Sequence, residues 1–272
     1  MTEPFRLINN SYLTIPNWQN EKTNLIVGFT TKKGGVSRGD FSSLNLGLHV
    51  KDDEWLVQQN KQYLSSLLSF STTKWVGCNQ VHDKKIVKID KRHAGLGVMD
   101  EKSAIQETDG MYTKEKDLLL TLCFADCVPI YFYSHNIVGI AHAGWQGTVK
   151  QIGPEMINKW KQEEGIDPAN IKVAIGPSIS SECYIVDDNV INKVRPLVHN
   201  DERQRVFNEI SLDQYSLDLK ELNKLLLIRA GVKEENILIS NYCTSNNHDL
   251  FFSHRRDNGK TGRMISFIGM KN

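Results

Sequence analysis

The sequence lacks any continuous apolar segment long enough to cross a membrane. Residues 1–20 are polar, and the most apolar stretch, residues 118–133, is interrupted by Asp126 and Pro129. An excess of charge of one sign is also missing, because 33 lysines and arginines face 32 aspartates and glutamates, for a net charge of +1. These absences predict a soluble, unexported protein with no membrane or nucleic-acid partner.

The cysteines do not form a disulfide pattern. Five of them, an odd number, are scattered over positions 78, 123, 127, 183 and 243, which fits a reducing compartment and predicts a cytoplasmic protein. Repeats, low-complexity tracts and linkers are absent from the sequence, and 40% hydrophobic residues suffice for a sizeable core. We therefore expect residues 1–272 to form a single domain, with a monomer as the default state.

The hydrophobic pattern mixes strands with helices. Short apolar runs predict strands at residues 25–31, 85–89, 118–123, 128–133, 137–142, 171–176, 237–241 and 264–268. Apolar residues at helical spacing predict helices at 52–70, after the turn at Gly147, and from Asp218, with Glu221 three residues later, to Gly231. Because strict alternation of strand and helix is missing, we expect an α+β fold with mixed sheets and not a doubly wound one.

Three potential metal donors stand beside these strands. Cys127 lies between two apolar runs, His142 ends the run at 137–141 ahead of a glycine turn, and His82 precedes the run at 85–89. Two imidazoles and a thiol suit a zinc centre with an open fourth position. Taken singly, each also has an ordinary explanation, since such a cysteine is most often a core residue and a lone histidine most often a satisfied core or surface group.

Several loops are candidates for anion binding. Residues 32–37, 144–148 and 176–180 are glycine-containing turns, and the second opens a helix whose first amides favour phosphate or carboxylate. Residues 253–263 concentrate three arginines, a lysine and a histidine beside two glycines, and such a segment can clamp a phosphate. Ordinary turn chemistry and a solvated charged turn are the alternatives.

Short segments along nearly the whole chain form one combined pattern, at residues 30–37, 43–47, 80–82, 108–110, 125–129, 142–145, 176–177 and 243–263. Together they resemble the laccase-domain family, also called multicopper polyphenol oxidoreductases, which includes YfiH-like proteins and mammalian FAMIN. The resemblance is closest to the bacterial YlmD-like branch. It implies an α+β fold with mixed sheets sandwiched between helices, and it assigns His82, Cys127 and His142 as ligands of one zinc ion.

The resemblance implies three kinds of activity. Family members have been described as enzymes that phosphorolyse adenosine, inosine, guanosine and methylthioadenosine and deaminate adenosine, as copper-dependent phenol oxidases, and as peptidoglycan editing factors. The eight histidines, at 49, 82, 93, 135, 142, 199, 248 and 254, contain no His-x-His pair of the kind that holds copper clusters in ordinary multicopper oxidases. We therefore expect a zinc-dependent enzyme that acts on purine nucleosides and phosphate, with copper able to occupy the site adventitiously.

Two aspartates are candidates for proton transfer near such a centre. In deamination, a metal-bound water would attack the purine carbon, and Asp126 or Asp109 would protonate the leaving ammonia, unless Asp126 only orients the ligands. Without a metal, Cys127 and His142 could instead act as nucleophile and base of a cysteine hydrolase or amidase.

Phosphate and nucleoside would be held by the glycine turn or by the arginine-rich segment. The candidates are Asn45, Gly144, Thr148, Arg255 and Arg256, although Asn45 can equally serve as a turn amide. Two positions depart from the family pattern. Gln146 replaces a residue that is often basic, which weakens a phosphate contact, and Ile185 replaces one that is often acidic.

Overall fold

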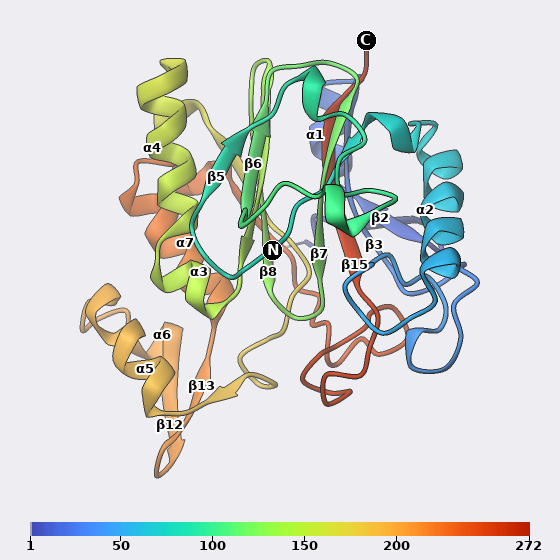
Figure 1. The fold of residues 1–272 in the computed structure, drawn as a ribbon. Helices are drawn as coiled ribbons and strands as arrows, with labels where there is room; N and C mark the ends of the chain where they lie inside the picture. Colours follow the sequence, from blue (N-terminus) through green and yellow to red (C-terminus); the bar gives the residue numbers. More distant parts are fainter. Residues whose placement is uncertain (1) are drawn as a thin grey trace.

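Two six-stranded sheets packed face to face form the centre of the molecule, in a computed structural model that describes residues 2–272 (Figure 1). The first sheet has the order β1-β2-β3-β15-β7-β4, over Arg6–Asn9, Tyr12–Thr14, Leu25–Thr30, Met264–Met270, Leu118–Phe124 and Trp75–Val76. The second has the order β14-β10-β8-β9-β6-β5, over Ile237–Ile239, Lys172–Ile175, Val128–Ser134, Ile137–Ala143, Gly110–Thr113 and Ile86–Lys88. Parallel pairs such as β10 with β14 stand beside antiparallel pairs such as β8 with β9, so the sheets are mixed.

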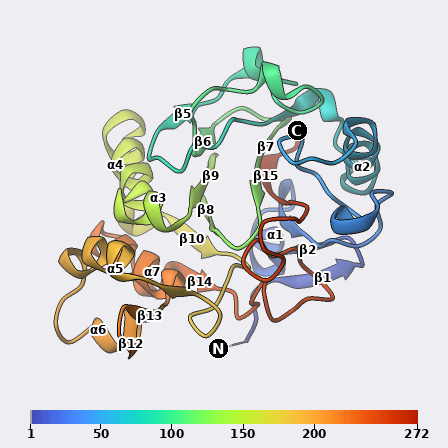
Figure 2. The same cartoon turned by 60° about the horizontal axis from the view of Figure 1, so that its bottom comes forward.

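Helices cover both outer faces of this pair of sheets. Figure 2 shows α2 on one side and α3, α4 and α7 on the other. Their bounds are Glu54–Leu68, Trp145–Val149, Ile152–Glu164 and Leu219–Arg229, and the shorter α1, α5 and α6 span Pro16–Glu21, Asp188–Val194 and Arg203–Val206. The expected α+β fold, with mixed sheets sandwiched between helices, is confirmed. Within residues 2–272, no helix is both long and apolar enough to cross a membrane.

Burial on both faces explains why most strands could be predicted from apolar runs. Strands β7, β8 and β9 are buried almost throughout, because one face of each sheet meets the other sheet and the opposite face meets helices. The core between the sheets contains Phe29 and Tyr131, the core under α4 contains Phe132 and Trp160, and the core under α2 contains Leu64. Each such side chain contributes about 1.5–3 kcal/mol by leaving water.

Helix ends agree with the predicted caps in one case and differ in another. The Asp218 carboxylate accepts a hydrogen bond from the Glu221 amide at 2.9 Å and starts α7, and Gly231, with φ of 98°, follows its end. Two helices replace the single helix predicted after a turn at Gly147: α3 already begins at Trp145 and contains Gly147, and α4 begins at Ile152. Gln151 adopts a left-handed conformation, with φ of 61°, and separates α3 from α4.

A third, small sheet lies outside the two-sheet centre, at the lower left of Figure 1. Its order is β11-β13-β12, over Ile185–Val186, Gln214–Leu217 and Phe207–Ser211. The sequence did not predict this sheet or strands β1, β2, β4 and β6. These strands are short or carry little apolar pattern: β12 is exposed at four of its five positions.

Candidate metal centre and cavity

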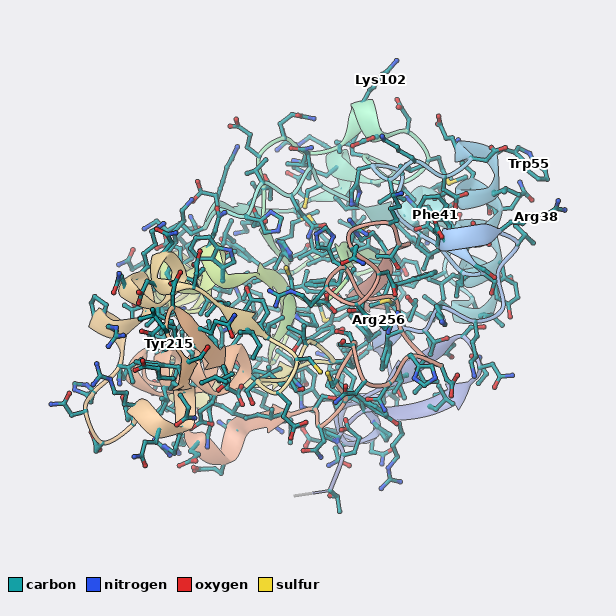
Figure 3. All side chains as sticks on the ribbon, turned by 90° about the horizontal axis from the view of Figure 1, so that it is seen from below. Arg38, Phe41, Trp55, Lys102, Tyr215 and Arg256 are labelled. Atoms are coloured by element: carbon teal, nitrogen blue, oxygen red, sulfur yellow. The ribbon has the colours of Figure 1, made fainter. Side chains whose placement is uncertain are left out.

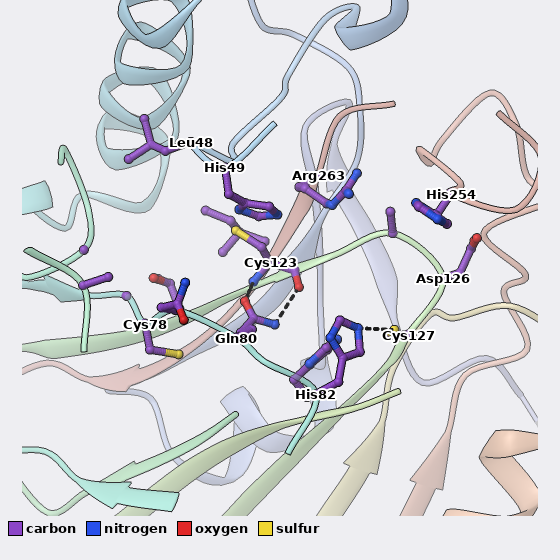
Figure 4. Close-up of a pocket in the computed structure, with 18 of the residues that line it drawn as sticks. Leu48, His49, Cys78, Gln80, His82, Cys123, Asp126, Cys127, His254 and Arg263 are labelled. Atoms are coloured by element: carbon purple, nitrogen blue, oxygen red, sulfur yellow. Dashed lines mark hydrogen bonds between the residues drawn. The ribbon is translucent and has the colours of Figure 1, made fainter. Parts of the chain in front are cut away.

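The three predicted donors meet at one end of the paired sheets. His142 lies near the end of β9, Cys127 lies on the turn that leads from β7 in the first sheet to β8 in the second, and His82 lies on the segment that leads from β4 to β5. Two of the donors therefore sit where the chain crosses between the sheets. One ligand atom of each residue lies within 4.8 Å of the other two, and His82 Nε2 is 3.9 Å from Cys127 Sγ (Figure 4).

This donor set fits a single metal ion. Zinc bound at about 2.0–2.3 Å to nitrogen and sulfur brings its ligand atoms to about 3–4 Å from one another, close to the separation of His82 and Cys127. The same three donors suit copper as well. Among residues 2–272 this is the one group of three or more His, Cys, Asp and Glu side chains arranged to hold a metal. A multicopper cluster has no second ligand group in this part of the chain.

Asp109 organises two of the three donors. His142 Nδ1 lies 2.8 Å from its carboxylate, and the backbone amides of Val81, His82 and Asp83 donate to the same carboxylate at 2.8–3.1 Å. Asp109 is fully buried, and although burial raises its pKa, these hydrogen bonds outweigh burial and lower it. Because an ionised carboxylate only accepts, Nδ1 of His142 carries a proton, and Nε2 is the ring nitrogen left for a metal.

Cys127 is poised as a thiolate. Burial alone would raise the pKa of its thiol, but the His142 and His82 imidazoles outweigh burial and lower that pKa to about 6. Burial likewise lowers the pKa of His142, whereas the Cys127 thiolate and the Asp109 carboxylate outweigh it and raise that pKa to about 9. The protein thus holds a thiolate against a cation, and a bound metal ion would replace the proton on His142 Nε2.

Gly144 leaves room for the donors. A Cβ atom at this position would lie 2.9 Å from Cys127 Sγ and 3.0 Å from the His82 ring. Gly144 caps α3, which has only five residues, so the dipole at this helix start is small. The glycine therefore serves close packing against the metal centre more clearly than it serves the anion site that the sequence suggested.

Asp126 organises a second set of loops beside the centre. It adopts φ of 86°, is 7% exposed, and lies next to Cys127 on the turn. Its carboxylate accepts hydrogen bonds from the Thr244 hydroxyl at 2.6 Å, the Ser253 hydroxyl at 3.0 Å and the Arg255 amide at 2.7 Å. One carboxylate thus fixes both ends of the segment 244–255 against the metal turn.

A cavity of about 530 Å³ opens beside the donors and has the size of a small-molecule site. His82, Cys127 and His142 line it together with Asp126, and Tyr184 and Arg255 form part of its wall. The guanidinium of Arg255 lies 5.0 Å from the centre of the Tyr184 ring and donates to the Ile185 carbonyl at 2.7 Å. Because this hydrogen bond uses the backbone of Ile185, it does not depend on which side chain position 185 carries. Gln146 also lines the cavity.

The far part of the cavity is cationic, and its residues were not singled out from the sequence. Arg263 and Lys61 line it and carry the charge, whereas burial lowers the pKa of His49, beside Arg263 in Figure 4, to about 4, so that this ring is neutral. The Arg263 guanidinium donates only to the Thr261 and Gly262 carbonyls, at 2.9 and 3.1 Å, and within residues 2–272 no carboxylate lies within ion-pair distance of it. Arg263 is the last residue of the arginine-rich segment 253–263, and its place there was the sequence signal that could have identified it. Its unpaired donors suit an anionic ligand.

Three of the predicted substrate-binding residues are engaged within the protein. Fully buried Asn45 donates to Asp52 at 2.8 Å and accepts from the Arg263 amide at 2.8 Å, and Thr148 accepts from Asn223 at 2.9 Å. Arg256 donates to the Asp257 carboxylate at 2.7 and 2.8 Å and to three backbone carbonyls at 3.1 Å; these carbonyls belong to Thr244, Ser245 and Phe251. Its side chain lies among the C-terminal loops (Figure 3). The structure thus brings Arg255, but not these three, to the cavity wall.

The chain is similar to known proteins over nearly its whole length. The family model described as multi-copper polyphenol oxidoreductase laccase matches residues 26–271. A protein named purine nucleoside phosphorylase YlmD, from Bacillus subtilis strain 168, is 48% identical over 273 residues, which is 98% of each chain. The protein of the same name from Geobacillus stearothermophilus is 49% identical over 248 residues, 90% of each chain.

Solved structures show the same architecture. The hypothetical protein YfiH of Bacillus licheniformis superposes with a TM-score of 0.95 at 46% identity, covering 99% of this chain and 100% of that chain. YlmD from Geobacillus stearothermophilus superposes with a TM-score of 0.95 at 44% identity and covers all of both chains.

Proposed function

Because this chain belongs to the multi-copper polyphenol oxidoreductase laccase family, we propose that it acts within that family as a zinc-dependent purine nucleoside phosphorylase. Its substrates are adenosine, inosine, guanosine and methylthioadenosine together with phosphate, its products are the free base and ribose 1-phosphate, and the same site deaminates adenosine. The names of the relatives from Bacillus subtilis and Geobacillus stearothermophilus support this proposal. The observation that carries it is one cavity with three metal donors, an aromatic wall and unpaired cationic donors.

His82, Cys127 and His142 would hold one zinc ion in this proposal. When bound, such an ion supplies a Lewis acid and an open coordination position for water or an anion. The protein contributes the thiolate and fixes the histidine tautomer through Asp109. Copper can take the same three donors, so the metal must be identified by analysis.

Arg263 and Arg255 are the proposed phosphate-side groups. Phosphorolysis forms a bond between a phosphate oxygen and the anomeric carbon of ribose and breaks the bond from that carbon to the purine nitrogen. The attacking phosphate is anionic, and the guanidinium of Arg263 offers it donors that no carboxylate neutralises. Arg255, stacked on Tyr184, frames the neighbouring wall, where an aromatic ring can pack against a purine.

We propose positioning roles for the two aspartates that the sequence suggested as proton donors. Both oxygens of Asp109 accept hydrogen bonds from the protein, and so do both oxygens of Asp126. Asp109 accepts two hydrogen bonds at each oxygen, whereas Asp126 accepts three in all and keeps one acceptor position, on the oxygen bonded by Thr244. Asp109 orients the donors, and Asp126 holds the segment that carries Arg255.

A second candidate function is a cysteine hydrolase or amidase acting on peptidoglycan precursors. Cys127, His142 and Asp109 form a chain of nucleophile, base and orienting carboxylate, and the thiol pKa of about 6 favours a nucleophilic thiolate. Metal content separates the two functions, because a Cys127 that ligates zinc is not a free nucleophile. A phenol oxidase is less well supported, since one group of three donors offers a site for one metal ion.

The test combines metal analysis of the purified protein with a phosphate-dependent assay on adenosine and inosine. We expect about one zinc per chain, release of base and ribose 1-phosphate, and loss of both metal and activity in Cys127→Ala. Cys123→Ala is the matched control, because this cysteine also lines the cavity but lies outside the donor group, and it should keep its metal. The cysteine hydrolase would be favoured instead if the protein is metal-free and leaves nucleosides intact, and if its Cys127 is alkylated equally with and without chelator.

The phosphate contact has a test of its own. Arg263→Met should raise the KM for phosphate by about tenfold or more and change the KM for nucleoside less, because the guanidinium is proposed to face the anion. Arg38→Met, at an exposed arginine, is the control and should change neither value. An unchanged KM for phosphate in Arg263→Met would remove this residue from the proposed phosphate site and leave Arg255 as the remaining candidate.

A further inference from the structure

Two cysteines outside the metal centre, Cys183 and Cys243, lie together behind one wall of the cavity. They follow β10 and β14, which are neighbouring parallel strands, and beyond the strand ends Ser178 still pairs with Cys243. Parallel pairing carries both segments out of the sheet at the same edge. The turn that follows Ser178 then brings Cys183 back toward Cys243.

Hydrogen bonds tie the two sulfur atoms to the same neighbour, Asn246. Cys183 Sγ donates to the Asn246 side chain at 3.0 Å, and the Asn246 amide donates to Cys243 Sγ at 3.4 Å. The Ser180 amide and hydroxyl also donate to Cys243 Sγ, at 3.3 and 3.1 Å. Burial raises the pKa of Cys243, but these donors outweigh it and lower that pKa, which favours the reactive thiolate.

The other cysteines differ in kind. Cys127 belongs to the metal donors. Cys78 and Cys123 line the deep part of the cavity, and burial raises the pKa of both thiols, which disfavours the thiolate that oxidants attack. Cys183 is also partly exposed and burial raises its pKa too, but its sulfur shares Asn246 with Cys243, whose pKa is lowered. Cys183 and Cys243 thus form a pair that combines a partly exposed thiol, a thiol activated by hydrogen bonds and a common hydrogen-bond partner.

We propose that Cys183 and Cys243 are a redox-sensitive pair that hydrogen peroxide, or an organic hydroperoxide, converts reversibly into a disulfide. The first thiolate attacks a peroxide oxygen and becomes a sulfenic acid as the O–O bond breaks, and one water leaves, or one alcohol where the oxidant is an organic hydroperoxide. The second sulfur then displaces hydroxide from it, which takes up the released proton as water, so that two thiols and one hydrogen peroxide give one disulfide and two waters. A dithiol reductant returns the pair to thiols, consistent with a compartment in which such bonds are transient.

The disulfide would act on the cavity wall from behind. Cys183 adjoins Tyr184, whose ring stacks with Arg255, and Cys243 adjoins Thr244, which donates to Asp126 at 2.6 Å. A covalent bond between the two cysteines ties the turn at 180–184 to the loop at 243–247. Oxidation therefore stiffens this wall without touching the three metal donors.

The experiment exposes metal-loaded, full-length protein to a small molar excess of hydrogen peroxide and counts its thiols. We expect the loss of two thiols, a tryptic cross-link between the peptides of Cys183 and Cys243, a Tm several degrees higher, and full reversal by dithiothreitol. Cys183→Ser should lose the cross-link and the rise in Tm while keeping its metal. Because Cys183 is partly exposed, this variant should fold even if Cys243→Ser does not.

The matched control is Cys78→Ser, which should still form the cross-link. Overoxidation of a single cysteine without a cross-link, or a cross-link that survives in Cys183→Ser, would overturn the proposal. Thiol counts, cross-linked peptides and Tm do not depend on the reaction that the cavity catalyses. The inference can therefore fail while the proposed function stands, and the reverse is equally true.

Discussion

Two buried aspartates organise two different regions of this protein. Asp109 directly precedes β6 in the chain and holds the metal centre, where four nitrogen donors form hydrogen bonds to its carboxylate. Asp126 lies on the turn before β8 and holds the loop wall, where two hydroxyl groups and one amide converge on it. Both carboxylates accept hydrogen bonds from the protein at both oxygens, but their partners differ in chemistry, and that difference sets how each region should respond to change.

The two sets of partners differ in whether they can reverse the direction of their hydrogen bonds. A hydroxyl group can turn and accept a hydrogen bond, whereas a backbone amide can only donate. The region around Asp109 therefore requires two acceptor oxygens, and the region around Asp126 tolerates one donor in place of an acceptor. We expect the metal centre to be the more rigid and less replaceable region, and the loop wall to be the adaptable one.

The largest effect should follow Asp109→Asn. Whichever way the amide is turned, its NH₂ group faces a donor, and an unsatisfied buried donor costs about 1–3 kcal/mol of unfolding free energy. Metal affinity should fall about 10–100-fold, because His142 loses its orienting partner. Denaturant unfolding and a competitive chelator titration measure the two quantities. The control is Asp53→Asn at the exposed cap of α2, where both residues cap well; unchanged metal affinity in Asp109→Asn would contradict the comparison.

A smaller effect should follow Asp126→Asn. The new NH₂ group can donate to the Thr244 hydroxyl while the remaining oxygen accepts from Arg255 and Ser253, so the unfolding free energy should fall by only about 1 kcal/mol. Metal content should be unchanged, whereas kcat/KM should drop roughly tenfold as Arg255 shifts. Metal analysis and steady-state kinetics of the same preparation test this. If the metal is lost as readily as in Asp109→Asn, the two regions are not separable.

The third effect is on the pH dependence of stability and not on metal binding or activity, and it concerns Lys61, which lies in neither region and lines the cationic part of the cavity. Burial lowers its pKa to about 8 in the folded protein, below the value of about 10.4 for an unfolded chain. Between pH values equal to these two pKa values, the folded state binds fewer protons than the unfolded state. The unfolding free energy therefore increases with rising pH, by on the order of 3 kcal/mol in total. Below pH 8 the penalty for the buried charge is fully present.

Lys61→Met removes this titration. The difference in unfolding free energy between the parent protein and the variant should therefore move in favour of the parent from pH 8 to pH 10. Lys102→Met is the matched control, since this lysine projects from the surface in Figure 3. A difference that stays constant over this pH range would show that the Lys61 pKa is not displaced by burial.

The sequence predicted the central strands and the long helices because these elements are buried on defined faces. Apolar runs such as β8 and β9 report burial on both sides, and the carboxylate of Asp218 reports a helix start. Prediction did less well where burial is not periodic. Strand β12 is exposed at four of its five positions, and the left-handed residue that separates α3 from α4 is Gln151 and not the nearby Gly153.

For the site, the identity of the three donors was available from residue type and from the family resemblance, and the structure brings them together. The roles of their neighbours were not available. Asp109, Asp126, Asn45 and Thr148 all carry groups able to touch a substrate, and in each case the fold directs those groups to protein partners. Arg263, in contrast, is left with unpaired donors in the cavity.

The sequence alone thus determined the α+β class, the central strands, the long helices, the family, and the residues able to hold a metal. These properties depend on local periodicity and on the chemistry of single residue types. Only the tertiary structure decided which polar groups are satisfied by the protein and which face the cavity, and only it placed Cys183 beside Cys243. Hydrogen-bond partners are set by segments that are distant in the chain, and in this molecule they meet where the chain crosses between its two sheets or leaves paired strands at a common edge.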